Sequence, residues 1–292
     1  MEKARKGRRC LVTGHTGYIG RALVRALEEG GHHVEGLAEE DGGFVDLLDH
    51  GAVARAVERI RPHTLFHMGG VSGPMCHADD PVHVLMVNVV GSEALLNAAE
   101  AFGVARVVTA GSVAGYARPG PLGPEPDNIY GLTKRVLELQ TRLWARRTGR
   151  EATCVRIGSV YGPGRQTESP IHKMVSDALR DDEIRYESYP MEPCIEIATC
   201  AGLIAALADV AHLQPRYDAV SERPHSDEVA EIVARLTGAR LAPQEAEDGV
   251  HPEFPEHFDA AMLTADGGHV RHATLEDAIF RIIRTYDANP VN

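Results

Sequence analysis

The first half of the chain alternates short apolar runs with stretches whose apolar residues recur at helical spacing. A short apolar run predicts a buried strand, whereas apolar residues three and four positions apart predict an amphipathic helix. The predicted strands are 8–13, 33–37, 64–67, 106–110 and 152–157, and the predicted helices are 17–30, 51–61, 84–102 and 129–147. Strands that alternate with helices in this order form a parallel, doubly wound sheet, so we expect an α/β fold of the Rossmann type.

The rhythm changes after residue 158. Loops rich in proline and glycine separate the helices predicted at 169–180, 199–211, 227–236 and 274–286. We therefore expect a Rossmann-type domain over residues 1–158 and a smaller substrate-binding lobe over 159–292, with sheet and lobe interleaved. Such a lobe would cover the carboxyl edge of the sheet, where ligands of open α/β folds bind.

Composition mainly argues against certain classes of partner, namely nucleic acids and membranes. The 292 residues are 43% hydrophobic and 25% charged, which is ordinary for a soluble globular protein. A net charge of −12 disfavours a nucleic-acid-binding surface and attachment to an anionic membrane. We interpret the basic stretch 1–9 as a solvated tail rather than a signal peptide, because no clean apolar run follows it. No window approaches ~18 continuous apolar residues, so no membrane span is expected.

Cysteine and histidine usage predicts neither a disulfide framework nor a metal site. The five cysteines are scattered without a C-x-x-C pair, which favours reduced thiols in a cytoplasmic protein. The fifteen histidines form no complete ligand set, even where two lie close together, as His269 and His272 do. The cysteines are Cys10, Cys76, Cys154, Cys194 and Cys200.

A glycine-rich turn, Thr13-Gly14-His15-Thr16-Gly17-Tyr18-Ile19-Gly20, stands between the first predicted strand and the first predicted helix. Glycines there permit a tight turn and close approach of the backbone to a pyrophosphate, and the helix N-terminus supplies oriented N–H groups. Such turns also cap ordinary helices. This one opens a strand–helix–strand unit, however, and therefore predicts dinucleotide binding.

Tyr130 and Lys134 lie four residues apart on the predicted helix 129–147 and so share one face. A tyrosine ordinarily has a pKa of about 10, and a nearby lysine cation favours the phenolate, which would let Tyr130 act as an acid/base near neutral pH. Ser112, at the end of the fourth predicted strand, could polarise the reacting oxygen. A buried tyrosine with a surface lysine would show the same spacing, so the upstream nucleotide turn is what favours the catalytic interpretation.

With these motifs the chain resembles an extended short-chain dehydrogenase/reductase of the NAD-dependent epimerase/dehydratase family. The resemblance extends over nearly the whole chain and is specific for the family rather than for a substrate. Besides TGHTGYIG and YGLTK, it rests on FVDLLD, HMGG, NVVGSEALLNAAE, GSVAGY, RIGSVYGPG and the terminal ATLEDAIFRIIRTY.

The resemblance implies a role for particular residues. Ser112, Tyr130 and Lys134 would be catalytic, with Tyr130 and Lys134 also contacting the cofactor. Asp46 could instead be a helix N-cap or loop carboxylate, and His67 a packed histidine at a strand end. The remaining cofactor contacts that the resemblance implies are Gly14, Gly17, Tyr18, Ile19, Gly20, Asp46, Leu47, His67, Met68 and Gly69. Substrate contacts are expected from Ser112, Ser159 and Arg165.

The end of the second predicted strand favours NAD as the cofactor and leaves NADP open. Family members that prefer NAD usually carry an aspartate there, whereas this chain has Ala38 followed by Glu39. No lysine or arginine lies between Gly31 and Ala54, so a 2′-phosphate has no evident partner except Arg21.

Further departures from the family pattern bear on the substrate. Val113 and Ala114 stand where the dehydratases carry acidic residues, so carboxylate-driven loss of water is not expected. Ser159 replaces an asparagine of the nucleotide-sugar enzymes. Glu192 lies near the position of their diphosphate-binding arginine, where a carboxylate would repel a diphosphate. The loop before the predicted catalytic helix is also shorter than in those enzymes.

The sequence thus predicts hydride transfer at a secondary alcohol or ketone of a polar, sugar-like molecule, by a dehydrogenase, reductase or epimerase. One alternative is a nucleotide-sugar 4-epimerase that retains its NAD. Its diphosphate clamp would have to come from Arg165, His172, Lys173 or Arg185, which could equally be a solvated basic cluster. The second alternative is a non-catalytic NAD(P)-sensing protein, although such a protein has little need for an intact catalytic trio.

The helices 84–102 and 129–147 carry apolar residues on more than one face. Family members commonly pair these two helices with their symmetry mates in a four-helix bundle, so the resemblance suggests a two-fold homodimer. The alternative is that both faces are buried within one subunit.

Overall fold

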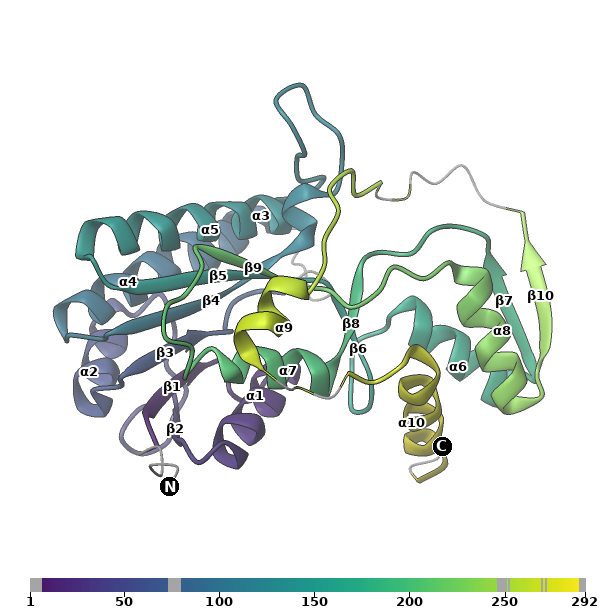
Figure 1. Ribbon diagram of the computed structural model, residues 1–292, viewed down its shortest axis with the longest axis horizontal. Coiled ribbons are helices and arrows are strands. Elements are labelled where there is room, and N and C mark those ends of the chain that lie inside the picture. The colour runs from purple at the N-terminus through teal and green to yellow at the C-terminus, as the bar shows by residue number, and fades with distance from the viewer. Residues whose placement is uncertain are drawn as a thin grey trace.

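A six-stranded parallel sheet forms the centre of the protein, with the strand order β2-β1-β3-β4-β5-β9 (Figure 1). Every pair of neighbouring strands in this sheet is parallel. Helices cover both of its faces, which confirms the expected α/β, Rossmann-type fold. The strands are β1 (Arg9–Thr13), β2 (His33–Gly36), β3 (Thr64–His67), β4 (Arg106–Ser112), β5 (Glu151–Ile157) and β9 (Arg216–Ala219). This computed structural model describes residues 7–72, 80–245, 251, 253–268, 270 and 272–288.

Two apolar layers hold the helices against the sheet. On one face, Leu23 and Leu27 of α1 (Tyr18–Glu29) pack in one core cluster with Leu203 of α7 (Ile197–Ala206). The other face is covered by α2 (His50–Ile60), α4 (Ser92–Ala101) and α5 (Ile129–Thr148). These helices agree with the sequence prediction within a few residues, except that α7 ends at Ala206 rather than near residue 211.

The sheet takes its last strand from the second half of the chain. β9 pairs with β5, in the register Val155 with Tyr217 and Ile157 with Ala219. α7 and α9 (Ala261–Gly267) also belong to this layer, since Leu263 of α9 lies in the same core cluster as α1. No apolar run in the sequence had indicated β9. The division into residues 1–158 and 159–292, with sheet and lobe interleaved, stays a prediction.

A smaller lobe lies beside the carboxyl edge of the sheet (Figure 1). It contains a parallel pair, β7 (Glu183–Glu187) with β10 (Arg240–Gln244), and the helices α6 (Pro170–Asp181), α8 (Ser226–Thr237) and α10 (Leu275–Ala288). Its core is a separate apolar cluster that includes Val175, Ile184 and Ile279. The short parallel pair β6 (Ser159–Tyr161) and β8 (Cys194–Glu196) lies between this lobe and the sheet.

The predicted helix 84–102 is continuous but irregular. It consists of α3 (Pro81–Leu85), a π-helical turn η2 (Met86–Gly91) and α4. By length and composition alone the helix could cross a membrane, which the sequence reading had not anticipated. Leu95 and Leu96 are fully buried in the core layer shared with α2, however, and the core helix of a protein can have the same length and composition as a membrane span.

Four of the cysteines, Cys10, Cys154, Cys194 and Cys200, are buried and unpaired. Cys76 and His269 lie outside the described residues.

Candidate active site

The glycine-rich turn after β1 is shaped by close backbone contacts. Gly14 has a φ of +64°, and a Cβ atom there would lie 2.7 Å from the Cα atom of Gly69 in the loop after β3. A Cβ atom on Gly20 would lie 2.0 Å from the Gly14 carbonyl oxygen. Side chains at these positions would separate the turn from α1 and from the β3 loop. Only glycine allows this local geometry.

The N-terminus of α1 faces this turn without a side-chain cap. Its N-cap residue is Gly17, and the first turn of α1 contains no acidic residue. The N–H groups of that turn and the helix dipole are thus available for an anion. The hydroxyl of Tyr18 is buried and has no hydrogen-bond partner among the described residues. These features fit the pyrophosphate of a dinucleotide.

The three predicted catalytic residues come from two neighbouring elements. Ser112 is the last residue of β4, and its Oγ accepts a hydrogen bond from the Ala114 N–H at 3.2 Å. Tyr130 lies in the first turn of α5 and is half-buried. Lys134 is buried one turn later. Its Nζ donates to the Ala110 carbonyl oxygen at 2.9 Å and lies 5.5 Å from the Tyr130 ring centroid.

Burial lowers the pKa of Lys134 to about 8, because desolvation disfavours the ammonium form. The Lys134 ammonium is therefore a stronger acid than that of an exposed lysine. Close to the Tyr130 ring, its charge is well placed to favour the phenolate. Lys134 Nζ and the Tyr130 ring thus lie close together, on the shared helix face that their spacing in the sequence predicts.

Gly131 lets α5 approach the turn that follows Ser112. A Cβ atom on Gly131 would lie 2.3 Å from the Ala114 carbonyl oxygen in the short helix η3 (Val113–Tyr116). Asn128 caps the first turn of α5 by accepting the Gly131 N–H at 2.8 Å. Together these contacts hold Tyr130 next to the end of β4.

Asn88, which the sequence analysis did not single out, braces the same region. Its buried side chain accepts the Val71 N–H at 2.8 Å and donates to Thr133 Oγ1 at 3.1 Å. The Thr133 hydroxyl donates in turn to the Tyr130 carbonyl oxygen at 2.8 Å. Asn88 lies in the π-helical turn η2, and such turns are frequent near functional sites.

A buried ion pair supports the catalytic helix from behind. The Glu138 carboxylate accepts from Arg156 Nε at 2.8 Å and from the Tyr116 hydroxyl at 2.6 Å. The same guanidinium reaches Glu256, in the segment that returns from the second lobe, at 3.0 Å. Sequence reasoning missed this network, although Tyr130, Lys134 and Glu138 repeat every four residues along one helix face.

The predicted cofactor contacts at the end of β3, His67, Met68 and Gly69, differ in how far their side chains are accessible. His67 is only 1% exposed, and its ring nitrogens lie 2.8 Å from Thr13 Oγ1 and 2.8 Å from Ser92 Oγ. Burial, with the nearby Lys134 charge, lowers the pKa of His67 to about 3, so the ring is neutral. A contact from His67 would therefore have to use its backbone. Gly69 is held by its N–H bond to Thr13 Oγ1 at 2.9 Å, and Met68 packs partly against the core.

Asp46 and Leu47 lie in the loop before α2. One Asp46 carboxylate oxygen accepts the Leu48 N–H at 2.9 Å, which is the loop-carboxylate arrangement considered above. The side chain is exposed, so this bond does not preclude the predicted contact with the cofactor. Leu47 is buried, and a Cβ atom on Gly91 would lie 2.8 Å from the Leu47 Cβ.

The expectation that only Arg21 could contact a 2′-phosphate is wrong, because α2 carries two further arginines to the end of β2. Arg59 donates to the Ala38 carbonyl oxygen at 3.0 Å and to Glu35 at 3.3 Å. Arg55 lies 3.9 Å from Glu39. A helix later in the chain thus brings two guanidinium groups to the end of β2, where carboxylates neutralise them.

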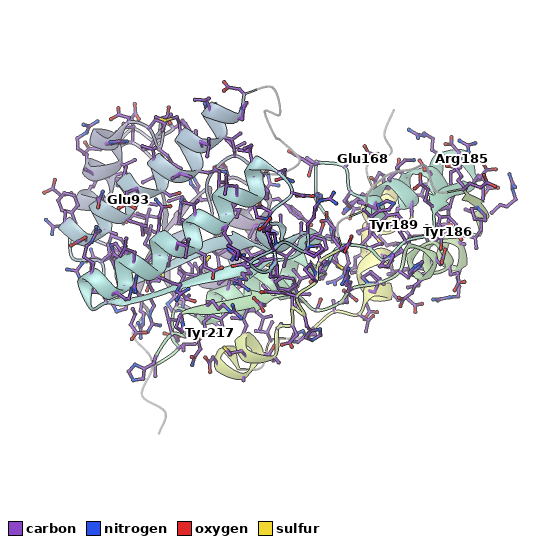
Figure 2. All side chains as sticks on the ribbon, turned by 90° about the horizontal axis from the view of Figure 1, so that it is seen from above. Glu93, Glu168, Arg185, Tyr186, Tyr189 and Tyr217 are labelled. Carbon is purple, nitrogen blue, oxygen red and sulfur yellow. The ribbon has the colours of Figure 1, made fainter. Side chains whose placement is uncertain are left out.

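The four residues considered for a diphosphate clamp, Arg165, His172, Lys173 and Arg185, do not form one. Arg165 is turned toward main-chain carbonyls, including those of Val160 and Thr167. His172 is buried, with its ring nitrogens 2.7 Å from Ser169 Oγ and 2.9 Å from the Gly162 carbonyl oxygen. The other two candidates are paired within the second lobe, Lys173 with Asp177 and Arg185 with Glu183. Figure 2 shows Arg185 toward the outer end of that lobe, beside Tyr186. These side chains do not converge on one anion site.

Comparisons with known proteins show the family of this chain. The family model for the NAD dependent epimerase/dehydratase family matches residues 10–186. A methionine adenosyltransferase 2 subunit beta of Xenopus tropicalis is 30% identical over 164 residues, which are 53% of this chain and 48% of that protein. The match thus spans about half the length of that relative.

Two further similarities cover most of the chain. A 2′-dehydrokanamycin reductase of Streptomyces kanamyceticus is 26% identical over 287 residues, or 93% of this chain and 73% of that protein. The structure of a UDP-glucose 4-epimerase of Thermus thermophilus, solved with NAD, matches with a TM-score of 0.79. Sequence identity there is 22%, over 96% of this chain and 99% of the other, and the likeness is one of fold.

Proposed function

Since this chain belongs to the NAD dependent epimerase/dehydratase family, we propose that it is an enzyme that transfers a hydride at a secondary alcohol or ketone of a polar, sugar-like molecule. The observation that carries the proposal is the arrangement of Ser112, Tyr130 and Lys134 beside an uncapped, glycine-rich nucleotide turn. The cofactor that this site fits is NAD or NADP, and NAD is the one we expect.

The bound nicotinamide would supply or accept the hydride, and the protein groups would handle the proton and the charge. Tyr130 donates a proton to the carbonyl oxygen in reduction and takes it back in oxidation. Lys134 favours the phenolate electrostatically and would bind the ribose hydroxyls. Ser112 donates a hydrogen bond to the reacting oxygen and holds it beside the phenol.

The chemistry expected at this site excludes one reaction of the family. Val113 is buried and Ala114 carries no ionisable group, so neither can act as the base that a dehydratase needs beside Ser112. We expect oxidation, reduction or epimerisation, in which the substrate keeps all of its oxygens. Ser159, half-buried at the start of β6, is proposed to contact the substrate together with Ser112. The expected contact from Arg165 would require its guanidinium to leave the carbonyls of Val160 and Thr167.

The nucleotide-sugar 4-epimerase remains the first alternative. It is supported by the relatives named as epimerases, one of which, from Mycolicibacterium smegmatis, is 29% identical over 197 residues. Against it stand the engagement of Arg165 and the pairing of Lys173 and Arg185. The second alternative is a non-catalytic NAD(P)-sensing protein. It is supported by the relative named as a subunit of another enzyme, and opposed by the intact catalytic trio.

Release of bound cofactor under denaturing conditions, followed by mass spectrometry, separates these possibilities. An enzyme that exchanges its cofactor should leave the site largely empty or partly loaded, and should oxidise NADH with some member of a panel of keto-sugars. Retained NAD together with interconversion of UDP-sugars would instead establish the epimerase. Bound cofactor without turnover of any panel member would support the binding protein. In that case the Tyr130→Phe variant should bind the cofactor as the wild type does.

The assembly that we propose is a homodimer in the cytoplasm, without membrane or nucleic-acid partners. The helix 81–101 and α5 present neighbouring apolar side chains that no described residue covers. Their exposed fractions are 66% for Val82, 41% for Met86, 36% for Val90, 40% for Leu132, 55% for Leu139 and 53% for Leu143. Leu95, Leu96, Leu137 and Trp144 of the same helices are buried inside the subunit. The exposed apolar side chains of these two helices are thus available to pack against a second copy of the chain.

A further inference from the structure

Glu192 lies next to the residues proposed to hold the substrate. In the sheet, Ser112 at the end of β4 is in register with Ile157 at the end of β5. Two residues later, the Ser159 N–H donates to the Pro193 carbonyl oxygen at 2.8 Å. The segment with Glu192 therefore runs beside the carboxyl end of β5, one strand away from Ser112.

This segment is fixed rather than loosely placed. A Cβ atom on Gly158 would lie 2.5 Å from the Pro193 carbonyl oxygen, so the two backbones are in close contact. On the other side, the Met191 N–H donates to the Pro224 carbonyl oxygen at 3.0 Å. Glu192 is thus held between two anchored neighbours, at the edge where open α/β folds bind their ligands.

The Glu192 carboxylate makes no hydrogen bond or ion pair within the described part of the chain, and its side chain is exposed. Even so, surrounding protein desolvates the carboxylate. This desolvation raises the pKa of Glu192, the nearby Asp127 raises it further, and Arg165 lowers it. Asp127 lies three residues before Tyr130, which places the carboxylate on the side of the predicted catalytic helix.

Two guanidinium groups in this region, those of Arg165 and Arg223, are occupied by main-chain oxygens. Arg165 donates to the carbonyls of Val160 and Thr167, the latter at 3.0 Å. Arg223 donates to the carbonyls of Met191 at 3.4 Å and Glu253 at 2.6 Å. Neither forms an ion pair with Glu192, so the carboxylate remains available to a ligand.

We propose that Glu192 is a specificity-determining residue, and that it selects substrates carrying an ammonium group over neutral or phosphorylated ones. This inference rests on the proposed function and names its substrate class as an amine-bearing, sugar-like alcohol or ketone. A partly desolvated carboxylate gains most from a cation that replaces lost water contacts, and it repels a phosphate. The match with the 2′-dehydrokanamycin reductase covers 93% of this chain, and kanamycin is a sugar-like molecule that carries amines.

Calorimetry on the full chain with saturating NADH tests the proposal without requiring turnover. The probes are kanamycin and glucosamine as amines, glucose and N-acetylglucosamine as neutral counterparts, and UDP as an anion. Physiological salt reduces unspecific attraction of polycations to a chain of net charge −12. We expect an amine to bind at least about tenfold more tightly than its neutral counterpart, and we expect UDP not to bind.

Two variants assign the effect to Glu192. Glu192→Gln should reduce the affinity for the amine by about tenfold or more while leaving NADH affinity unchanged. Glu231→Gln, on the exposed surface of α8, removes the same charge away from the site and should change neither. Equal amine binding by wild type and Glu192→Gln, failure of both amines to bind, or tighter binding of UDP or a neutral sugar would overturn the proposal.

The proposed function fails in a different way. A Tyr130→Phe variant that binds the amine normally and also retains turnover would refute the catalytic assignment without affecting the role of Glu192. Amine binding lost only in Glu192→Gln would support the specificity role whether or not turnover is observed.

Discussion

The Glu138 carboxylate on α5 and the Arg156 guanidinium on β5 form a buried ion pair, with Arg156 Nε 2.8 Å from Glu138 Oε2 and side chains only 7% and 3% exposed. Tyr116 donates to the same carboxylate and lies in η3, directly after Ser112. The pair therefore ties the catalytic helix to the strand and turn that carry the other half of the proposed active site.

Glu138→Gln should destabilise the protein by about 3–5 kcal/mol, because it leaves the Arg156 charge buried without its main partner. Thermal or denaturant unfolding measures the loss. Glu100→Gln is the matched control, since Glu100 pairs with Arg147 at 2.7 Å on the surface. That variant should lose no more than about 1 kcal/mol. Equal losses of unfolding free energy in the two variants would show that burial does not make the Glu138–Arg156 pair more important for stability than the surface pair.

The same pair predicts a sensitivity to acid. Burial alone would raise the pKa of Glu138, but hydrogen bonds from Arg156 and Tyr116 and the Arg156 charge outweigh it and lower the pKa. A lowered folded-state pKa contributes stability above the ordinary value of 4.5, and this is lost as the pH falls through the folded pKa. The stability difference between wild type and Glu138→Gln should therefore shrink below pH 4.5. A constant difference would contradict the charge-based account.

Tyr130→Phe should lower turnover on the order of 10²-fold or more, because the proton of the reacting oxygen loses its positioned acid/base. NADH affinity, measured by fluorescence titration, should stay nearly unchanged. Tyr286→Phe, on α10 in the second lobe, is the control and should retain full turnover. Turnover of Tyr130→Phe within a few-fold of wild type would rule out the assigned role.

Lys134→Met should reveal the cost of burying the lysine charge. The folded pKa of about 8 lies below the unfolded value of 10.5, so between these values the unfolded chain binds more protons. Stability from this group therefore rises with pH across that window, by at most about 1.4 kcal/mol per pH unit. Wild type should gain stability relative to Lys134→Met as the pH increases from about 8 toward 10.5. A stability difference that does not change over this range would contradict this account.

Glu39→Gln should weaken the expected preference for NAD over NADP. Glu39 neutralises Arg55 at 3.9 Å, and its removal would free a guanidinium for a 2′-phosphate at the end of β2. We expect calorimetry to show a several-fold smaller ratio of the two affinities. Glu40→Gln changes the same charge at an exposed neighbour and should leave the ratio unchanged. Tighter binding of NADP by the wild type would mean that Arg55 or Arg59 already serves the phosphate.

The proposed dimer predicts that Leu139→Glu combined with Leu143→Glu yields a monomer. Both leucines are more than half exposed on α5, and carboxylates in the middle of an apolar interface would be desolvated without partners. Light scattering at micromolar concentration should give twice the chain mass for wild type. Leu179→Glu, at an exposed leucine of α6, should stay dimeric. A fully active monomeric wild type would show that these faces need no partner.

The local parts of the site could be predicted from the sequence. The glycine turn is a property of a few consecutive residues, since Gly14 and Gly20 meet constraints of backbone shape. The spacing of Tyr130 and Lys134 places both on one face of any helix, whatever it packs against. The parallel sheet also follows from the order of strands and helices, because the connections between them admit few arrangements.

Long-range contacts decided the rest. β9 is a short edge strand of four residues with mixed burial, so no apolar run marks it in the sequence. It is recognised as a strand only by its pairing with β5. The approach of Arg55 to Glu39 depends on how α2 packs beside β2. The engagement of Arg165 and the burial of His67 likewise depend on backbone and side chains distant in sequence. Periodicity reports which face of an element is apolar, whereas the partner of a charge is chosen only when those elements pack.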